Sequence, residues 1–427
     1  MHYDIVIIGG GAGGLELAAM LGRSLGKCAG REKVLLIDRA VFHIWKPTLH
    51  EVAAGTLDAH QEGLSYPILA RRNHFSFTLG ELRGLDAQQR SLTLAELRDG
   101  EGKVLVPERQ ISYRWAVLAI GSGSNFFGTP GGAEHAFVLE QAADAERFRR
   151  HLLGAFTRAA FAEPRQLGIA IVGGGATGVE LAAELLEAHQ EFHEGTAGEH
   201  RFRLDISLVE AGARILAGLP EKISQQATAA LVAKQVKVLT GTKVTEVKTD
   251  RLVTSAGDIP AALIVWAAGI KAADSNDTLG LATNKAHQFV VNAQLATSAE
   301  GVYALGDCAA CPWHEGKLIP ARAQAAHQQA TYLKRVLLAL LRERRHDAPF
   351  VYRDFGSLVS LGDNKGVGNL MGGLAGRNFF VEGLIAKWMY MSLHLNHHRA
   401  ILGTSGTAVL ALARLLQRRV SGRLKLR

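Results

Sequence analysis

The opening residues constrain the fold of this 427-residue chain more than any other stretch. A short apolar run at residues 3–8 leads into Gly9-x-Gly11-x-x-Gly14, and apolar residues at helical spacing follow. This order predicts a strand, a tight glycine turn and a helix. Gly9 would make the turn, Gly11 would let backbone N–H groups approach a pyrophosphate, and Gly14 would let the helix pack closely on the strand. The loop glycines that we expect to bind a cofactor are Gly9, Gly10, Gly11, Gly13 and Gly14.

The same signature returns in the middle of the chain. Residues 169–172 are apolar, and Gly173, Gly175 and Gly178 repeat the glycine spacing ahead of another helical pattern. One such motif is weak evidence, but two in the same strand-to-helix context are improbable by chance. We therefore expect an α/β protein with two Rossmann-like domains that bind two dinucleotides.

Each glycine loop is followed by a second apolar strand that ends in an acid. Asp38 lies 24 residues after Gly14, close to the spacing of about 20 at which an acid accepts hydrogen bonds from the adenosine ribose. Glu210 lies 32 residues after Gly178, and the hydrophilic insertion at 188–203 would explain the extra length. A carboxylate there would repel a 2′-phosphate, so NAD is favoured over NADP, although Arg214 follows four positions later.

The order of the remaining strands predicts that one domain is inserted into the other. Apolar strands end at Gly121 and Gly269, and a third ends in Gly306-Asp307, where flavoproteins with two dinucleotides place the acid that binds the ribityl chain of FAD. The alternative for Asp307 is a helix N-cap. Alternating strands between 75 and 106 predict a small sheet inserted in the first domain. The expected division is an FAD-binding domain at 1–145 and 288–345, an NADH-binding domain at 146–287, and a C-terminal membrane-anchoring region at 346–427.

Residues 43–55 are too rich in aromatic and polar side chains for an ordinary connection. Lys46, Thr48 and His50 could reach the edge of a flavin, and the alternative is a loop whose apolar residues cap the core. No thiol pair occurs here, which disfavours a disulfide reductase. Cys308-x-x-Cys311 could be a redox dithiol or half of a metal site, but no second cysteine pair completes a tetrahedron, so no metal site is expected.

A long helix is expected at 321–344. Gln324 and Gln328 lie one turn apart near its N-terminus, whose partial positive charge would favour an anionic reduced flavin. Two amides on one face could donate hydrogen bonds to a quinone carbonyl. The alternative is a surface helix with ordinary polar residues, although its second half is rich in leucine.

The charge of the chain is unevenly placed. All 40 acidic residues lie at or before Glu382, so the whole formal excess of +8 falls after that residue. Such a block favours an anionic surface, and we expect a membrane rather than nucleic acid as the partner. Its members are Lys387, Arg399, Arg414, Arg418, Arg419, Arg423, Lys425 and Arg427.

The last apolar run, between Arg399 and Arg414, holds 14 residues, too few to span about 30 Å of hydrocarbon. A helix lying in the membrane interface fits this pattern, with its arginines among anionic headgroups. The alternative is a dimer contact or a core helix, which leaves a homodimer open. Three cysteines and a core strand at residue 3 indicate a reducing compartment without a signal peptide, so we expect a peripheral protein on the cytoplasmic face of the plasma membrane.

The combination of motifs resembles the bacterial respiratory type II NADH dehydrogenases over essentially the whole chain. It is carried by the two glycine loops, His-Ile-Trp-Lys46-Pro-Thr-Leu-His-Glu51, Val-Gly-Gly-Gly-Ala-Thr-Gly178-Val-Glu180, Val-Trp-Ala-Ala-Gly269-Ile-Lys271, Ala-Leu-Gly-Asp307-Cys and Arg322-Ala-Gln324-Ala-Ala-His-Gln328. The resemblance departs at Asn364-Lys365, which we cannot match to the family.

The resemblance implies non-covalent FAD, NADH as the donor and a membrane quinone, ubiquinone or menaquinone, as the acceptor, without proton pumping. It also implies that Glu180 lies by the nicotinamide and the flavin, and that Gln324 and Gln328 line the quinone site. The catalytic residues would then be Glu180, Gln324 and Gln328. The rival hypotheses are a sulfide:quinone or disulfide reductase and a non-catalytic redox-sensing flavoprotein.

Overall fold

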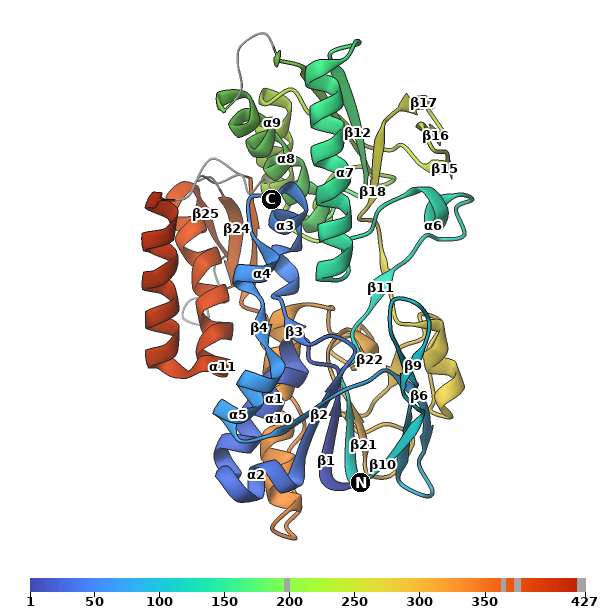
Figure 1. Ribbon diagram of the computed structural model, residues 1–427, viewed down its shortest axis with the longest axis vertical. Coiled ribbons are helices and arrows are strands. Elements are labelled where there is room, and N and C mark those ends of the chain that lie inside the picture. The colour runs from blue at the N-terminus through green and yellow to red at the C-terminus, as the bar shows by residue number, and fades with distance from the viewer. Residues whose placement is uncertain (196–199, 362–365, 372–377, 421–427) are drawn as a thin grey trace.

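The computed structural model describes residues 1–195, 200–361, 366–371 and 378–420. Two α/β lobes lie one above the other along the long axis, and a C-terminal sheet and helix pair lies beside their junction (Figure 1). The expected α/β class with parallel sheets is therefore confirmed. Asn364-Lys365 and the basic residues Arg423, Lys425 and Arg427 lie outside the described residues.

The first lobe is built on a seven-stranded sheet in the order β5-β2-β1-β10-β7-β6, with β21 also paired to β10. The central strands β5, β2, β1, β10 and β21 are parallel, whereas β7 and β6 are antiparallel. Their bounds are β1 His2–Ile8, β2 Val34–Asp38, β5 Ser76–Leu79, β6 Leu82–Asp86, β7 Ser91–Leu94, β10 Arg109–Leu118 and β21 Val302–Ala304.

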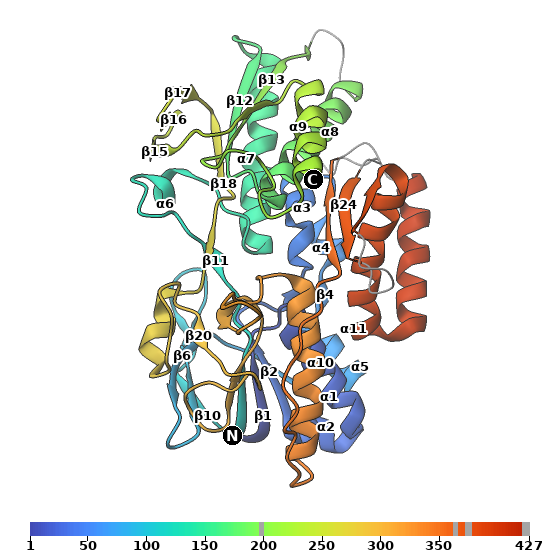
Figure 2. The same ribbon diagram turned by 180° about the vertical axis from the view of Figure 1, so that it is seen from behind.

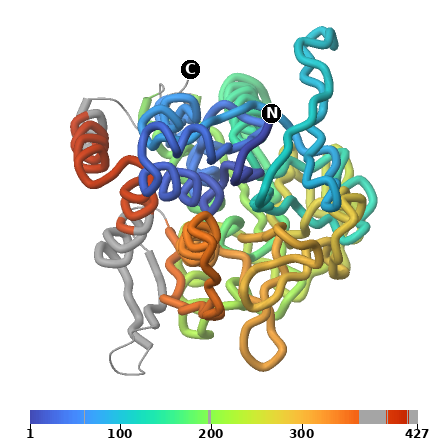
Figure 3. The backbone as a smooth tube through the Cα atoms, turned by 90° about the horizontal axis from the view of Figure 1, so that it is seen from below, coloured from blue at the N-terminus to red at the C-terminus, as the bar shows by residue number. Residues whose placement is uncertain are grey.

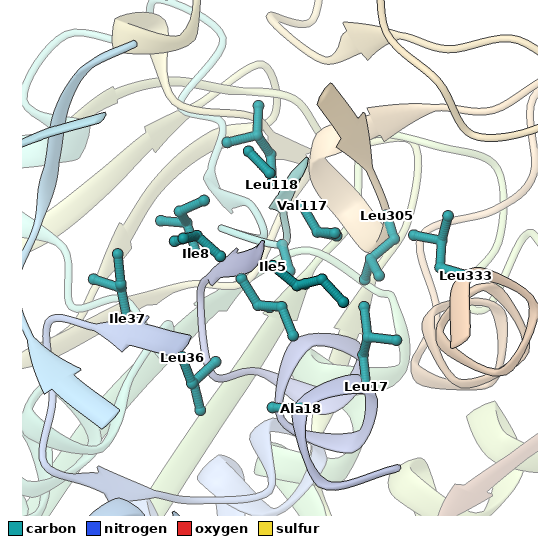
Figure 4. Packing of buried hydrophobic residues seen from close by; sticks show 14 of the residues in the cluster. Ile5, Ile8, Leu17, Ala18, Leu36, Ile37, Val117, Leu118, Leu305 and Leu333 are labelled. Atoms are coloured by element: carbon teal, nitrogen blue, oxygen red, sulfur yellow. The ribbon is translucent and has the colours of Figure 1, made fainter. Parts of the chain in front are cut away.

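Helices cover this sheet because its central strands are apolar on both faces. Leu17 and Ala18 of α1 (Ala12–Leu25) and Leu333 of α10 (Ala323–Leu340) pack over Ile5 and Val117 of the sheet (Figure 4). The long helix expected at 321–344 is thus confirmed as α10. The other helices of the lobe are α2 Lys27–Lys33 and α5 Tyr66–Asn73.

The prediction of a small inserted sheet between residues 75 and 106 is largely wrong. β5 is the edge strand of the main sheet, parallel to β2, and β6 and β7 extend the same sheet beyond β10. A strand at the edge of a large sheet and a strand of a hairpin both alternate apolar and polar residues. The sequence pattern therefore did not distinguish between them. Only β8 (Leu97–Arg98) and β9 (Val104–Val106) form a separate hairpin, which projects from the lobe (Figure 3).

The second lobe holds a four-stranded parallel sheet in the order β14-β13-β12-β18 and a smaller antiparallel sheet, β15-β16-β17. Its strands are β12 Gln166–Val172, β13 Arg203–Val209, β14 Lys237–Leu239, β15 Val244–Val247, β16 Arg251–Thr254, β17 Gly257–Pro260 and β18 Leu263–Trp266. Its helices are α7 Ala142–Phe161, α8 Ala176–Glu194 and α9 Glu221–Ala233.

The lobes are joined by two adjacent crossings of the chain. β11 (Gly123–Ser124) pairs antiparallel with β19 (Ile270–Lys271), so the chain leaves and re-enters the first lobe side by side. In addition, α3 (Leu49–Ala54) packs its Leu49 and Val52 into the core of the second lobe. The boundaries at 145 and 287 stay predictions.

The C-terminal region adds an antiparallel sheet of β23 (Gly356–Ser360), β24 (Gly366–Met371) and β25 (Asn378–Glu382), followed by α11 (Gly383–Val420). Gly403, with φ +74°, breaks α11 into two helices that run antiparallel to each other (Figure 2). Ile401 is fully buried in the core of the first lobe, so part of α11 is a core helix. Within the described residues, no helix combines the length and apolar character that crossing a bilayer requires.

Candidate cofactor and active site

The first glycine loop, between β1 and α1, has the geometry that a phosphate requires. Gly9 adopts φ +104°, and a Cβ there would lie 2.3 Å from the carbonyl oxygen of Ala119. A Cβ on Gly14 would lie 1.9 Å from the carbonyl oxygen of Gly9. By contrast, a Cβ on Gly11 would meet nothing within 4 Å, so open space faces the start of α1, where phosphates are stabilised.

The second loop, between β12 and α8, repeats this geometry. Gly173 adopts φ +112°, and a Cβ on Gly178 would lie 2.0 Å from the carbonyl oxygen of Gly173. Gly175, like Gly11, faces open space at the start of its helix. The two loops are equivalent in structure as well as in sequence, and both fit a pyrophosphate.

Each of the two predicted acids accepts a hydrogen bond from the backbone N–H of the second glycine in its glycine loop. Asp38 accepts a hydrogen bond from the Gly10 N–H at 2.6 Å, and Glu210 accepts one from the Gly174 N–H at 2.7 Å. Burial raises the pKa of Asp38, although its backbone donors act in the opposite direction. The Arg214 guanidinium donates to three carbonyls of its own loop, those of Leu216, Ala217 and Leu219, so it is committed within that loop.

Three distant segments meet where the FAD ribityl chain and ring are expected. The Lys46 ammonium donates to the Ser122 carbonyl oxygen at 3.1 Å, and the Ser122 hydroxyl donates to Asp307 Oδ2 at 2.9 Å. Gly121 (φ +75°) precedes Ser122, and Gly306 (φ +73°) precedes Asp307, so both turns need glycine. Thr48 is buried, and its hydroxyl donates to the Trp45 carbonyl.

Two further predicted glycines shape the edges of these loops. Gly269 (φ +66°) lies against the ring of Phe127, where a Cβ would come within 2.4 Å. A Cβ on Gly13 would lie 2.4 Å from Leu305 Cδ1, so α1 packs closely against the strand that leads to Asp307.

Glu180 of α8 is buried where three parts of the chain meet. Its Oε1 accepts a hydrogen bond from the Ser360 N–H at 3.1 Å, and its Oε2 lies 3.6 Å from His50 Nδ1. Burial raises the pKa of Glu180 to about 8, and the nearby Glu51 and Glu184 act in the same direction. Glu180 therefore holds a proton at pH 7.

His50 is a buried polar neighbour of Glu180. Burial lowers the pKa of His50 to about 4, while a hydrogen bond to the Pro47 carbonyl acts against this. Its Nε2 is buried and has no hydrogen-bond partner among the described residues. A neutral imidazole with a free nitrogen suits a site that receives a polar ligand.

Gln324 and Gln328 do lie on one face of α10, but both amides are already engaged. Gln328 donates to the Arg353 carbonyl at 2.8 Å and accepts from the Arg353 N–H at 3.0 Å. Gln324 donates to the Gly356 carbonyl and accepts from the Phe355 N–H. The two glutamines therefore hold residues 353–356, the segment that leads into β23 and to Ser360.

Several polar residues of these sites were missed by the sequence analysis. Ser122 supports Asp307, and the buried Gln329 accepts from the Gly306 N–H at 2.7 Å. Asp354 pairs with Arg322 at 3.1 Å, and Ser360 donates to Glu180. The Gly-Ser after an apolar strand at 121–122 was a readable signal, whereas nothing local marks Ser360 as a partner of Glu180.

The thiols of Cys308 and Cys311 are placed where they cannot react readily, whereas Cys28 is exposed. Cys308 and Cys311 are buried, and burial raises the pKa of Cys308 to about 12 and that of Cys311 to about 11. Thiolate is the reactive form of cysteine, so burial disfavours reaction at these two thiols. Among the described residues, no group of His, Cys, Asp and Glu is arranged to hold a metal ion.

One of the expected membrane-facing arginines is used inside the protein. Arg414 forms an ion pair with Glu62 and lies 3.4 Å from His398 Nε2. It fastens the second half of α11 to the first lobe, so Arg414 is engaged within the protein, whereas the sequence pattern placed the arginines of this helix among anionic headgroups.

Comparison with known proteins shows which protein family this chain matches and which solved structures share its fold. Residues 3–330 match the family model described as pyridine nucleotide-disulphide oxidoreductase. A solved structure of NDH2 from Plasmodium falciparum in complex with NADH has the same fold, with a TM-score of 0.82 at 18% identity and 99% of both chains covered. A sulfide:quinone oxidoreductase from Aquifex aeolicus shares the fold less closely, with a TM-score of 0.73 at 16% identity over 98% and 95% of the chains.

Sequence comparison narrows the class. The chain is 39% identical to the type II NADH:quinone oxidoreductase of Haemophilus influenzae over 99% of both chains. It is 26% identical to the enzyme of the same name from Staphylococcus saprophyticus, over 86% of this chain and 90% of the relative. The chain belongs to the type II NADH:quinone oxidoreductases, so the resemblance noted in the sequence is confirmed.

Proposed function

We propose that this type II NADH:quinone oxidoreductase binds FAD at the first glycine loop and NADH at the second. The observation that carries the proposal is the pair of equivalent loops, each open over Gly11 or Gly175 and each braced by an acid. When bound, FAD accepts a hydride from NADH and passes two electrons to a quinone. The residues that would hold FAD are the first loop, Asp38, Lys46, Thr48, Gly121, Gly306 and Asp307.

The second lobe would orient NADH so that its nicotinamide reaches the junction of the lobes. Gly173, Gly175 and Gly178 would hold the pyrophosphate, Glu210 the ribose, and Gly269 would close the far edge. Because Arg214, the cation four positions after Glu210, donates to carbonyls of its own loop, NADH rather than NADPH is the proposed donor.

Glu180 would hold and donate a proton at the junction of the two lobes. Its carboxyl is protonated at neutral pH because it is buried beside Glu51 and Glu184. Reduction of a quinone to a quinol consumes two protons, and Glu180 can hold one of them. Gln324 and Gln328 would line the quinone site together with the segment at 353–356 that they hold. Ubiquinone and menaquinone are both compatible with this proposal, and no step moves protons across a membrane.

The quinone would be reached from a membrane surface. Val409, Leu412 and Leu416 are exposed by 69%, 57% and 57% on the second half of α11, and their spacing places them on one helix face. An apolar stripe beside basic residues is typical of a helix that lies in the membrane interface. We propose peripheral attachment to the cytoplasmic face of the plasma membrane, and sedimentation in detergent would show whether the protein is also a homodimer.

The test is an anaerobic titration of the purified protein. NADH should bleach the flavin absorbance in a stoichiometric reaction, and a soluble quinone should restore it. A flavin that NADH bleaches but quinone does not restore would indicate a redox sensor. Bleaching that requires sulfide, or that titrates with protein thiols, would indicate a sulfide or disulfide reductase, which the buried Cys308 and Cys311 disfavour.

A further inference from the structure

A buried hydrogen-bonded chain connects the C-terminal helix to the first glycine loop. His397 of α11 lies between Glu16 of α1 and His43 of β3 (Phe42–His43), with Nδ1 2.6 Å from Glu16 Oε1 and Nε2 2.8 Å from His43 Nε2. His43 Nδ1 in turn lies 3.0 Å from the Gly10 carbonyl oxygen. These three side chains are each less than 5% exposed. The other oxygen of Glu16 pairs with His327 of α10.

The partners fix the direction of each hydrogen bond. A carbonyl oxygen only accepts, so His43 Nδ1 carries a proton and donates to Gly10. Burial lowers the pKa of His43 well below its usual value, so the ring is neutral and its Nε2 accepts. The proton between the two rings therefore belongs to His397 Nε2.

The other nitrogen of His397 faces a carboxylate. Burial raises the pKa of Glu16, but hydrogen bonds from His327 and His397 outweigh that effect, and the net pKa lies below the ordinary value. Glu16 is thus ionised and accepts from His397 Nδ1. His397 contacts Glu16 through one ring nitrogen and His43 through the other, which makes it the link between α1 and β3.

This chain ends on the peptide group that faces the phosphate site. The Gly10 carbonyl accepts from His43 and also from the Tyr66 hydroxyl at 2.8 Å. In a planar trans peptide, the Gly10 C=O and the Gly11 N–H point in opposite directions. Holding the carbonyl therefore directs the Gly11 N–H away from His43. Since Gly10 N–H is held by Asp38, both peptide groups of Gly10 are fixed.

The second glycine loop provides a comparison within the same molecule. The equivalent carbonyl, that of Gly174, accepts from the backbone N–H of Leu216 at 2.7 Å. The Gly174 carbonyl is thus held by a main-chain N–H, whereas the Gly10 carbonyl is held by the side chains of His43 and Tyr66. Among the described contacts, only the first loop is tied to α11.

We propose that His397 is a positioning residue for FAD, which acts through His43 to orient the Gly10–Gly11 peptide toward the pyrophosphate. The C-terminal helix would then be part of the flavin site as well as a membrane attachment. The inference rests on the proposed binding of FAD at the first loop. It predicts that changes in α11 alter the affinity for FAD without altering that for NAD⁺.

The test measures dissociation constants of FAD, on reconstitution of the apoprotein, and of NAD⁺ on the same preparations. His397→Leu should weaken FAD binding by about tenfold, the effect of losing a hydrogen bond of ordinary strength, and leave NAD⁺ binding within about twofold. His398→Leu is the matched control, because His398 is a buried neighbour whose ring nitrogens contact the His394 carbonyl of its own helix and Arg414, and neither nitrogen contacts Glu16 or His43. It should leave FAD binding within about twofold.

Variants of His43 separate positioning from simple loss of structure. Asn places an amide N–H near the position of His Nδ1 but cannot reach His397, so His43→Asn should weaken FAD binding about as much as His397→Leu does, whereas His43→Leu, which also loses the donor to Gly10, should weaken it further. Because the link is already cut in His43→Asn, adding His397→Leu there should have little further effect.

Each outcome decides the proposal. Equal FAD affinity in the wild type and His397→Leu would overturn it, and so would a parallel loss of NAD⁺ affinity or an undiminished effect of His397→Leu in the His43→Asn background. A wild-type protein that binds no FAD would instead overturn the proposed function.

Discussion

The backbone N–H of Ser360 donates to Glu180 Oε1 across 3.1 Å, although the two residues are 180 positions apart. Glu180 belongs to the helix after the second glycine loop, and Ser360 ends the first strand of the C-terminal sheet. The segment before that strand is held by Gln324 and Gln328. The proposed nicotinamide side and quinone side of the flavin are therefore connected by a short, continuous set of contacts.

Glu180→Gln should slow quinone reduction at neutral pH. The variant keeps an acceptor for the Ser360 N–H but has no proton to give, and loss of a general acid typically costs at least about a hundredfold in rate. Rapid mixing of NADH-reduced protein with quinone measures this step. In the wild type the rate should fall as pH rises through about 8, where Glu180 loses its proton. An identical pH profile in both proteins would exclude Glu180 as the proton donor.

The same carboxyl should make stability depend on pH. The folded-state pKa of Glu180, about 8, is above the ordinary 4.5, so the folded state binds the proton more tightly than the unfolded state. The resulting stabilisation is complete below the unfolded pKa and is lost as pH rises toward 8. Relative to Glu180→Gln, the wild type should lose free energy of unfolding on the order of 4 kcal/mol between pH 4.5 and pH 8. Denaturant titrations of both proteins across this range measure the difference, and parallel curves would show that Glu180 is ionised throughout.

Glu210→Ala should relax the preference for NADH. Removal of the carboxylate removes its repulsion of a 2′-phosphate and also frees the Gly174 and Gly212 N–H groups that it now binds. We expect the ratio of kcat/KM for NADH to that for NADPH to fall by about tenfold, the usual size of one such electrostatic contact. Glu210→Gln controls for the loss of the two hydrogen bonds. If the ratio were unchanged in both variants, Glu210 would not face the ribose.

Gln328→Ala should affect the second half-reaction and spare the first. The substitution removes both hydrogen bonds to the Arg353 backbone and so loosens the segment that leads to Ser360. NADH should reduce the flavin at an unchanged rate in rapid mixing, while reoxidation by quinone slows by about tenfold. Lys334→Ala, farther along α10, is the control. A slowed first half-reaction would place Gln328 on the nicotinamide side.

The sequence predicted the cofactor-binding framework because its determinants are local. Gly9, Gly14, Gly173 and Gly178 have no room for a Cβ, so the order strand, glycine turn and helix can be read directly. Asp38 and Glu210 follow at the end of the next strand of each sheet, where such an acid is expected. The contacts that complete the sites are not local. His397 with Glu16 and Ser360 with Glu180 join segments whose proximity depends on how the C-terminal region docks.

The same limit applies at the C-terminus. The sequence pattern of α11 predicted an interfacial helix, but burial of Ile401 and the pairing of Arg414 with Glu62 depend on its docking against the first lobe. Arg23 and Arg72 donate to the carbonyls of Ala400 and Leu402 at the turn between its two halves. A truncation at Gly383 would therefore damage the first lobe, and it cannot test membrane binding by itself.

Substitution of the exposed stripe tests membrane attachment without that damage. Val409→Glu combined with Leu412→Glu should leave the fold and FAD content unchanged, because both side chains are largely exposed. Loss of two apolar side chains from the bilayer should cost about 3 kcal/mol, or roughly a hundredfold in affinity for vesicles. Sedimentation with vesicles that contain anionic lipid measures this, and NADH oxidation with a water-soluble quinone should continue at the wild-type rate.

Val232→Glu, on an exposed position of α9 in the second lobe, is the matched control and should bind vesicles normally. High salt should release the wild type only in part, since salt screens the basic residues but leaves apolar burial intact. The double variant keeps only Leu416 of the exposed stripe, so it depends mainly on electrostatic attraction and high salt should release most of it. Undiminished vesicle binding of the double variant in high salt would show that the protein attaches through a surface other than the second half of α11.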